Sequence, residues 1–249
     1  MRNRPIPHIS EHDKARVQAF VLYEDEHVLA FNKPSGLAVQ TRGNRGTSLD
    51  FLLWAFARSN GKRPELVHRI DTGTSGVIIA AKTKPAAAFF NDAFARRTVQ
   101  KTYLALVRGD LQADDAGRCD LALRKSGRRV YVDGMTVPRH DPADTRSPAP
   151  FGKPMSAVTH WQTQARSDDA ALIEASPETG RMHQIRAHMA GMGHPILGDK
   201  IYGDARSAPR LMLHAYRLVL PHPDKKELAL EAPVPEDFTA VQSRLGLGI

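Results

Sequence analysis

Two short segments of the chain hold the side chains with the clearest chemical potential. Residues 68–76 read HRIDTGTSG and lie directly before an apolar run at 77–81, and loops at strand ends often carry functional groups. Residues 179–203 contain three histidines, two arginines and one aspartate. Such groups can serve nucleophilic catalysis, proton transfer, metal binding or phosphate recognition. Each of these chemistries makes a further demand that the sequence can meet or fail.

The carboxylate of the first segment is Asp71. Its tripeptide, Asp-Thr-Gly at 71–73, is typical of aspartic proteases, but these need two such carboxylates that share one proton, and the chain has no second Asp-Thr-Gly or Asp-Ser-Gly. A glycosidase needs two positioned carboxylates, and Asp199 is the only other acidic residue of the two segments. A polar turn in which Asp71 caps local backbone amides is the structural alternative.

The histidines of the second segment raise the question of a metal. His183 and His188 are five residues apart, which on a helix points them about 140° away from each other and prevents that pair from chelating one ion. The lone cysteine, Cys119, can form neither an intrachain disulfide nor a multi-thiolate site. We therefore predict no metal, and stoichiometric zinc or manganese would indicate a metal hydrolase instead.

The elements that must position these residues are interleaved strands and helices, which favours one α+β domain with a mixed or antiparallel sheet. Residues 1–18 are predicted to form a basic, poorly ordered arm, residues 19–249 a single domain, and residues 112–156 a loop-rich excursion. N-caps are expected at Thr47 or Ser48 and at Thr83. Strands are expected at 20–23, 28–31, 77–81, 102–107, 129–132, 157–165, 170–176 and 211–220, and helices at 47–59, 85–97, 182–192 and 235–245.

Composition narrows the class of partner. The 249 residues include 35 Lys and Arg against 27 Asp and Glu, a net charge of +8, which favours a polyanionic partner. No stretch approaches 18 uncharged apolar residues, and the first residues lack the apolar segment of a signal peptide. With one cysteine, a reducing compartment is the natural setting. We expect a cytoplasmic protein that does not enter a membrane.

Taken in order, the motifs resemble the RluA-type family of RNA pseudouridine synthases. The sequence departs from the family pattern at Ile70, where leucine is usual, and at Met182, where threonine is usual. The resemblance implies the pseudouridine synthase fold, a single catalytic domain around a bent mixed or antiparallel central sheet with flanking helices and a central RNA cleft. The matching segments are 32–37, 68–76, 101–105, 152–154, 180–186, 198–199, 202–203 and 213–215.

The resemblance also implies an activity, the isomerisation of uridine to pseudouridine in structured ribosomal or transfer RNA without a cofactor. Asp71 resembles the catalytic nucleophile, and Arg186 its cationic partner in a two-point pair. Tyr103 resembles the ring that stacks on the flipped uracil and serves proton transfer at carbon 5. Arg69 resembles the residue that enters the RNA stack. From the residues alone, Arg186 reads as a surface helix arginine, Tyr103 as core packing and Arg69 as a phosphate contact.

Two further sets complete the expected site. The alternative function is a non-catalytic RNA-binding or ribosome-assembly module. For Leu213, packing in the core is the alternative to a substrate contact. We expect the first twenty residues to be too short for a separate RNA-binding domain, which favours a compact target such as an RNA stem-loop. We also expect a monomer without a required protein partner. Substrate contacts are expected from Arg69, His68, Thr74, Leu213 and Ile185, and RNA backbone contacts from Lys33, Lys101, Lys153, Arg181 and His183.

Overall fold

A computed structural model describes residues 7–41, 47–109, 115–127, 129–134 and 151–248. Contacts group the chain into two compact units, the first formed by 1–100 with 215–233 and the second by 101–214 with 234–249. Arg2 and Arg4 of the expected arm, and the middle of the expected excursion, lie outside the described residues. The expectation of a single catalytic domain stays a prediction.

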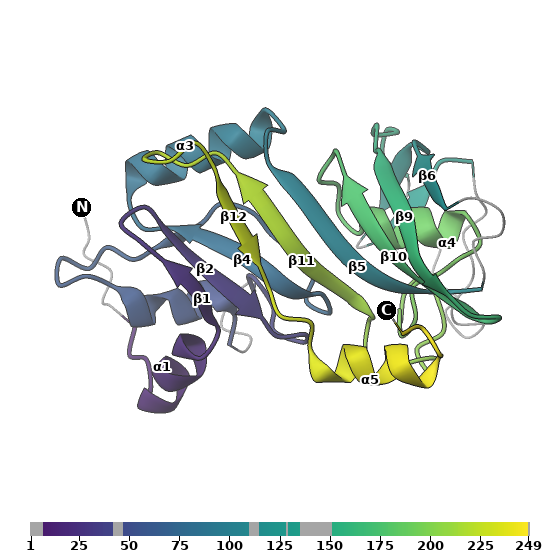
Figure 1. The fold of residues 1–249 in the computed structure, drawn as a ribbon. Helices are drawn as coiled ribbons and strands as arrows, with labels where there is room; N and C mark the ends of the chain where they lie inside the picture. The colour runs from purple at the N-terminus through teal and green to yellow at the C-terminus, as the bar shows by residue number, and fades with distance from the viewer. Residues whose placement is uncertain (1–6, 42–46, 110–114, 128, 135–150, 249) are drawn as a thin grey trace. The chain divides into compact units, whose positions relative to one another are not determined.

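The first unit is built on a sheet in the order β1-β2-β4-β11 (Figure 1). The hairpin of β1 and β2 confirms the expected strand pair near residues 20–31, and β2 pairs antiparallel with β4. The short β3 pairs with β4, and β12 pairs with β11. The strands are β1 (Val21–Glu24), β2 (Val28–Lys33), β3 (Glu65–Leu66), β4 (Ser75–Ala81), β11 (Leu213–Leu220) and β12 (Leu228–Glu231).

Strand β4 is the centre of this unit, and all seven of its residues are buried. Val77 and Ile79 face one hydrophobic core, which includes Phe90 of α3, and Ile78 faces another, which includes Phe31 of β2. A strand covered on both faces needs apolar residues at every position and not at alternate ones. The continuous run at 77–81 predicted this arrangement, and the structure confirms it.

The helices of the first unit are α1 (Glu11–Gln18), α2 (Leu49–Leu52), which continues as a 3-10 turn (Leu53–Phe56), and α3 (Lys84–Ala95). Ser48 and Thr83 cap α2 and α3 as expected. Helix α1 corrects the prediction of a poorly ordered arm. The Ser10 hydroxyl accepts from the Asp13 N–H, and Val17 is fully buried. Because Val17 is the helix's only buried residue, α1 has no apolar period by which to recognise it.

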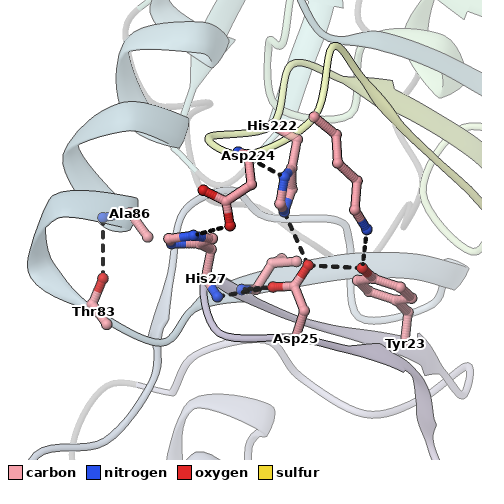
Figure 2. Close-up of polar contacts among 9 residues, drawn as sticks. Tyr23, Asp25, His27, Thr83, Ala86, His222 and Asp224 are labelled. Atoms are coloured by element: carbon pink, nitrogen blue, oxygen red, sulfur yellow. Dashed lines mark hydrogen bonds and ion pairs between the residues drawn. The ribbon is translucent and has the colours of Figure 1, made fainter.

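A cluster of titratable side chains ties the β1–β2 turn to the loop between β11 and β12 (Figure 2). Asp25 accepts from the Tyr23 hydroxyl at 2.7 Å and pairs with His222 at 2.9 Å, while His27 pairs with Asp224 at 2.7 Å. Burial raises the pKa of Asp25, but the Tyr23 hydroxyl and two backbone N–H groups outweigh it and hold the pKa at about 2. The stability it contributes is complete above about pH 4 and is lost as the pH falls toward 2.

The second unit has an antiparallel sheet in the order β5-β10-β9-β6 and a separate hairpin of β7 and β8. The hairpin of β9 and β10 confirms the expected strand pair at 157–176. The expected excursion at 112–156 contains more regular structure than predicted, namely strands β6 to β8. Leu123 and Val130 of this region pack against Ala187 of α4. The elements are β5 (Gln100–Arg108), β6 (Ala116–Cys119), β7 (Leu123–Ser126), β8 (Arg129–Val132), β9 (Thr159–Arg166), β10 (Ala170–Pro177), α4 (Gln184–Gly191) and α5 (Glu236–Arg244).

The fold class agrees with the prediction of an α+β protein with sheets and few helices. The core of the second unit joins β5 and β10 to α4 and α5 through residues such as Leu106, Ile173, Met189 and Phe238. In the described part of the chain, no helix is long and apolar enough to cross a membrane.

Candidate functional site

The turn that carries Asp71 is held in place by hydrogen bonds from the segment that follows β2. The Gly36 N–H donates to the Thr72 carbonyl at 2.8 Å, and the Ser35 hydroxyl donates to the Gly73 carbonyl at 2.7 Å. Within the turn, the Thr74 N–H donates to the Asp71 carbonyl at 3.1 Å. The carbonyls of Asp71, Thr72 and Gly73 are therefore fixed, while Asp71 itself is only half-buried.

Lys33 supports the same turn from inside the protein. The burial of its side chain contradicts the expected contact with the RNA backbone. Its side chain is fully buried, and its Nζ donates to the carbonyls of Pro34 at 2.9 Å, Leu37 at 2.8 Å and Thr72 at 3.2 Å. An ammonium has three N–H donors, so these three carbonyls match it. A phosphate outside cannot reach this group. Lys33, Ser35 and Gly36 of the segment 32–37 thus all support the Asp71 turn.

The turn leads into β4 through Thr74, Ser75 and Gly76, all of which are buried. Gly76 has a φ of +109°, and a Cβ on it would lie 2.2 Å from the carbonyl oxygen of Ala215. Only glycine meets both conditions. With 1% of its surface exposed, Thr74 is placed to shape the turn, and this burial argues against the substrate contact expected of it.

His68 and Arg69 point in different directions at the start of the segment. The His68 Nε2 accepts from the Ile79 N–H at 3.0 Å, and its ring stacks on Phe94 with 4.6 Å between centroids. Strand β3 ends at Leu66 opposite Ala80, so the imidazole satisfies the next backbone donor of β4. This placement gives His68 a structural role, and the substrate contact expected of it stays a prediction. Arg69 is exposed.

In the second unit, Arg186 is buried on α4 and forms a two-point pair. Its Nε donates to Asp199 Oδ2 at 2.7 Å and its Nη2 donates to Asp199 Oδ1 at 2.8 Å. The guanidinium carbon lies 5.2 Å from the centre of the Tyr202 ring. The expected surface arginine is thus excluded. Asp199 of the loop 198–203 thus accepts a two-point pair from Arg186, and the expected pair of Arg186 with Asp71 stays a prediction.

Asp199 is fully buried, yet its charge is well supported. Burial raises the pKa of its carboxyl, but the hydrogen bonds and charge of Arg186 and the backbone N–H groups of Ile201 and Tyr202 outweigh it and hold the pKa below its usual range. From the residues alone, Asp199 is a candidate metal ligand with the three histidines or a second glycosidase carboxylate. The sequence feature that could have indicated a role beside Arg186 is the position of Asp199 in the matched segment 198–199.

Helix α4 begins two residues later than expected because His183 has a left-handed backbone with φ of 53°. Its side chain faces Tyr202, with 3.0 Å between Nδ1 and the hydroxyl, and the RNA backbone contact expected of it stays a prediction. Gln184 closes the turn: its Oε1 accepts from the Thr179 hydroxyl at 2.6 Å, and its Nε2 donates to the Val158 carbonyl at 2.8 Å. The segment 179–186 is thereby a fixed platform for Arg186.

The other histidines of the second segment, His188 and His194, contact oxygen atoms of the protein. His188 is fully buried between the Thr159 hydroxyl at 2.9 Å and the Leu121 carbonyl at 2.9 Å, and burial lowers its pKa, which favours the neutral ring. His194 Nδ1 lies 3.1 Å from the Arg108 carbonyl. Among the residues that the structure describes, no group of three His, Cys, Asp or Glu is placed to hold a metal ion.

The remaining expected site residues lie in the second unit. Tyr103 is half-buried on β5, opposite Ala175 of β10, and packs against the core. Lys101 is two positions earlier on β5 and therefore on the same face. Ile185 and Leu213 are buried in that core, and for Leu213 this agrees with the packing alternative. Lys153 and Arg181 are exposed, and Arg181 Nε donates to the Ser156 carbonyl at 3.1 Å.

Comparison with known proteins gives these features a context. A family profile described as RNA pseudouridylate synthase matches residues 27–191. Ribosomal large subunit pseudouridine synthase D of Nitrosomonas europaea is 36% identical over 245 residues, which are 92% of this chain and 66% of that protein. Dual-specificity RNA pseudouridine synthase RluA of Yersinia pestis is 38% identical over 208 residues, 82% of this chain and 93% of that one.

A solved structure of a human protein has a similar fold. Human RNA Pseudouridylate Synthase Domain Containing 4 superimposes with a TM-score of 0.76 and 25% identity, covering 96% of this chain and 98% of that one. The profile match includes the whole of the first segment, 68–76, and the second segment as far as residue 191. The chain therefore belongs to the RNA pseudouridylate synthase family and is an RluA-type RNA pseudouridine synthase.

Proposed function

We propose that the protein isomerises specific uridines of structured ribosomal or transfer RNA, with Asp71 as its catalytic carboxylate. The observation that carries this proposal is the fixed Asp71 turn, in which the buried Lys33 ammonium, the Ser35 hydroxyl and the Gly36 N–H hold the backbone beside a carboxylate that is itself half-buried. The names of the relatives in Nitrosomonas and Yersinia, which refer to the large ribosomal subunit and to dual specificity, support this substrate class.

The reaction breaks the bond between ribose carbon 1 and nitrogen 1 of uracil, rotates the base and forms a bond from the same ribose carbon to carbon 5. A proton leaves carbon 5 and nitrogen 1 gains one, so the reaction is balanced without a redox partner. Asp71 acts on the uridine as an anion, by attack on the ribose, by attack on the ring or by assisting elimination. A fixed backbone favours any of these, because it places the carboxylate before the substrate arrives.

Arg186 supplies the positive charge that such a carboxylate needs. RNA brings phosphates, and a closed site removes water, and both disfavour an anion. A guanidinium offsets this cost and stays protonated at any physiological pH. We assign this role to Arg186, which is held in a fixed plane on α4 by its fork with Asp199.

Arg69 and Tyr103 serve the extrusion and handling of the base. Arg69 is exposed beside the Asp71 turn and is assigned to the RNA stack, where it replaces the uridine that leaves. Tyr103 is assigned to stacking on the flipped uracil and to proton transfer at carbon 5. A non-catalytic RNA-binding module would make no use of a supported carboxylate, and the family membership does not favour it.

The experiment is a pseudouridine map of ribosomal and transfer RNA from cells with and without this protein, and with the wild-type gene restored. We expect one or a few uridines to lose the modification without the protein and to regain it on restoration, and these positions identify the target. Identical maps in all three strains would contradict the proposal. Altered ribosome assembly with an unchanged map would instead favour the non-catalytic module.

A further inference from the structure

Asp199 is the feature of the second unit that the proposed roles leave unused. Its carboxylate is fully buried and contacts Arg186 through both oxygens. Oδ1 also accepts from the Ile201 N–H at 2.8 Å and the Tyr202 N–H at 3.2 Å. Two backbone donors and one side-chain fork therefore fix the rotation of this carboxylate about its own bond.

The same contacts fix the guanidinium. A planar guanidinium can still slide or tilt when one hydrogen bond holds it, but a fork to two carboxylate oxygens defines its plane and its direction. The Tyr202 ring covers it at 5.2 Å from the guanidinium carbon, and the Tyr202 hydroxyl accepts from the Val130 N–H at 3.0 Å. Arg186 is thus held at one edge and against one face, and Nη1 takes no part in the pair with Asp199.

We propose that Asp199 is a positioning residue of the isomerisation, which sets the plane of the Arg186 guanidinium for its work on the reacting uridine. This proposal rests on the role proposed above for Arg186. Asp199 itself touches neither substrate nor reacting atoms. It acts through geometry, and a displacement of about 1 Å at a catalytic group can lower a rate by about a hundredfold.

The test measures single-turnover pseudouridine formation and RNA affinity separately. The substrate is RNA from cells that lack the protein, assayed at the uridine found by mapping. We expect Asp199→Asn to lower the rate constant by about a hundredfold or more while the dissociation constant for RNA stays within about threefold. The reason is that an amide keeps the size of the carboxylate but presents an N–H to one of the two Arg186 donors.

A matched control exists in the same unit. Arg210 Nε and Nη2 donate to Asp237 at 2.6 and 2.7 Å, so this pair has the same fork geometry. Asp237 lies on α5, and neither residue is among the proposed site residues. Asp237→Asn removes the same charge from the same type of pair. Its rate constant is expected to stay within about twofold of wild type, whatever happens to the melting temperature of either variant.

A double-mutant cycle tests whether Asp199 acts through Arg186. Arg186→Lys alone should also lower the rate, and adding Asp199→Asn to it should cost little more. Losses that multiply, or Asp199→Asn within threefold of wild type while Arg186→Lys is impaired, would overturn the proposal for Asp199. A wild-type rate in Arg186→Lys would instead overturn the proposed role of Arg186.

Asp199→Glu decides the case if Asp199→Asn does not fold. It keeps the charge that buried Arg186 needs but moves the carboxylate by one methylene group. We expect a folded protein with at least a tenfold lower rate constant and unchanged RNA affinity. A wild-type rate would show that the position of this carboxylate does not matter, and the proposal would fail.

Discussion

His68, Arg69 and Asp71 lie within four positions of one another, yet their surroundings differ. His68 gives its ring to Phe94 and its Nε2 to the backbone of β4, Arg69 is exposed, and Asp71 is half-buried above a fixed turn. A short motif therefore combines a residue that holds the turn, one that faces solvent and one that carries charge. Substitutions at the three positions should have different consequences.

Arg69→Ala should slow the reaction by removing the side chain that takes the place of the flipped base. A target uridine that is already mismatched or unstacked needs less help, so such a substrate should recover at least about tenfold of the lost rate. Parallel single-turnover assays on paired and mismatched versions of the mapped target measure this. Equal losses on both RNAs would mean that Arg69 is a phosphate contact.

Tyr103→Phe removes one hydroxyl from a half-buried ring on β5 and leaves the packing against the core intact. RNA affinity should stay within about threefold, because stacking needs only the ring, and product formation should fall by about a hundredfold or more, as is typical for a general acid or base. Filter binding and product formation on the same preparation separate the two. An unaffected rate would leave Tyr103 as a core residue.

At the scale of elements, the start of β4 depends on the absence of a side chain at Gly76. Gly76→Ala brings a methyl group against the Ala215 carbonyl, so we expect it to lower the free energy of unfolding by more than about 3 kcal/mol. Gly36 also has a positive φ, +85°, but no atom lies within 4 Å of its Cβ position, so Gly36→Ala should lower it by only about 1–2 kcal/mol.

Urea unfolding of the two alanine variants measures this difference through the midpoint at constant slope. Both substitutions add the same methyl group at a positive φ, so the comparison isolates the steric contact with Ala215. Equal losses in the two variants would show that the close approach of β4 and Ala215 is not limiting.

Sequence patterns predicted the elements better than the contacts between them. The run at 77–81 revealed β4, but the late start of α4 depends on the backbone of His183, and α1 buries only Val17. The bond from Lys33 to the Thr72 carbonyl spans 39 positions of sequence. Periodicity reports which face of an element is buried and says nothing of a partner so far along the chain, which is why Lys33 was assigned to RNA.

At the scale of the whole molecule, the net charge of +8 favours RNA, but part of the local charge is already compensated. Arg118 pairs with Asp120 and Arg124 with Asp133, both within the expected excursion at 112–156. Exposed pairs of this kind contribute little to stability, but each cation already has an anionic partner within the protein. The charge available for RNA is therefore smaller than a count of residues implies.

Lys153 is exposed in a matched motif, and Lys153→Ala should weaken RNA binding in a salt-dependent way. The plot of log affinity against log salt should become shallower by about one unit, the effect of one lost phosphate contact. Lys84→Ala, an exposed lysine in no matched motif, should leave the slope unchanged. Titrations from low to physiological salt measure both, and equal slopes for Lys153→Ala and wild type would remove Lys153 from the interface.

The central claim is that Asp71 performs the reaction, and one measurement addresses it most directly. Purified wild-type protein and Asp71→Asn are compared for pseudouridine formation and for binding on RNA from cells that lack the protein. Because the amide keeps the shape of the carboxylate and loses its charge, we expect no detectable product with RNA affinity within about threefold of wild type. A rate within about tenfold of wild type would contradict the assignment of Asp71.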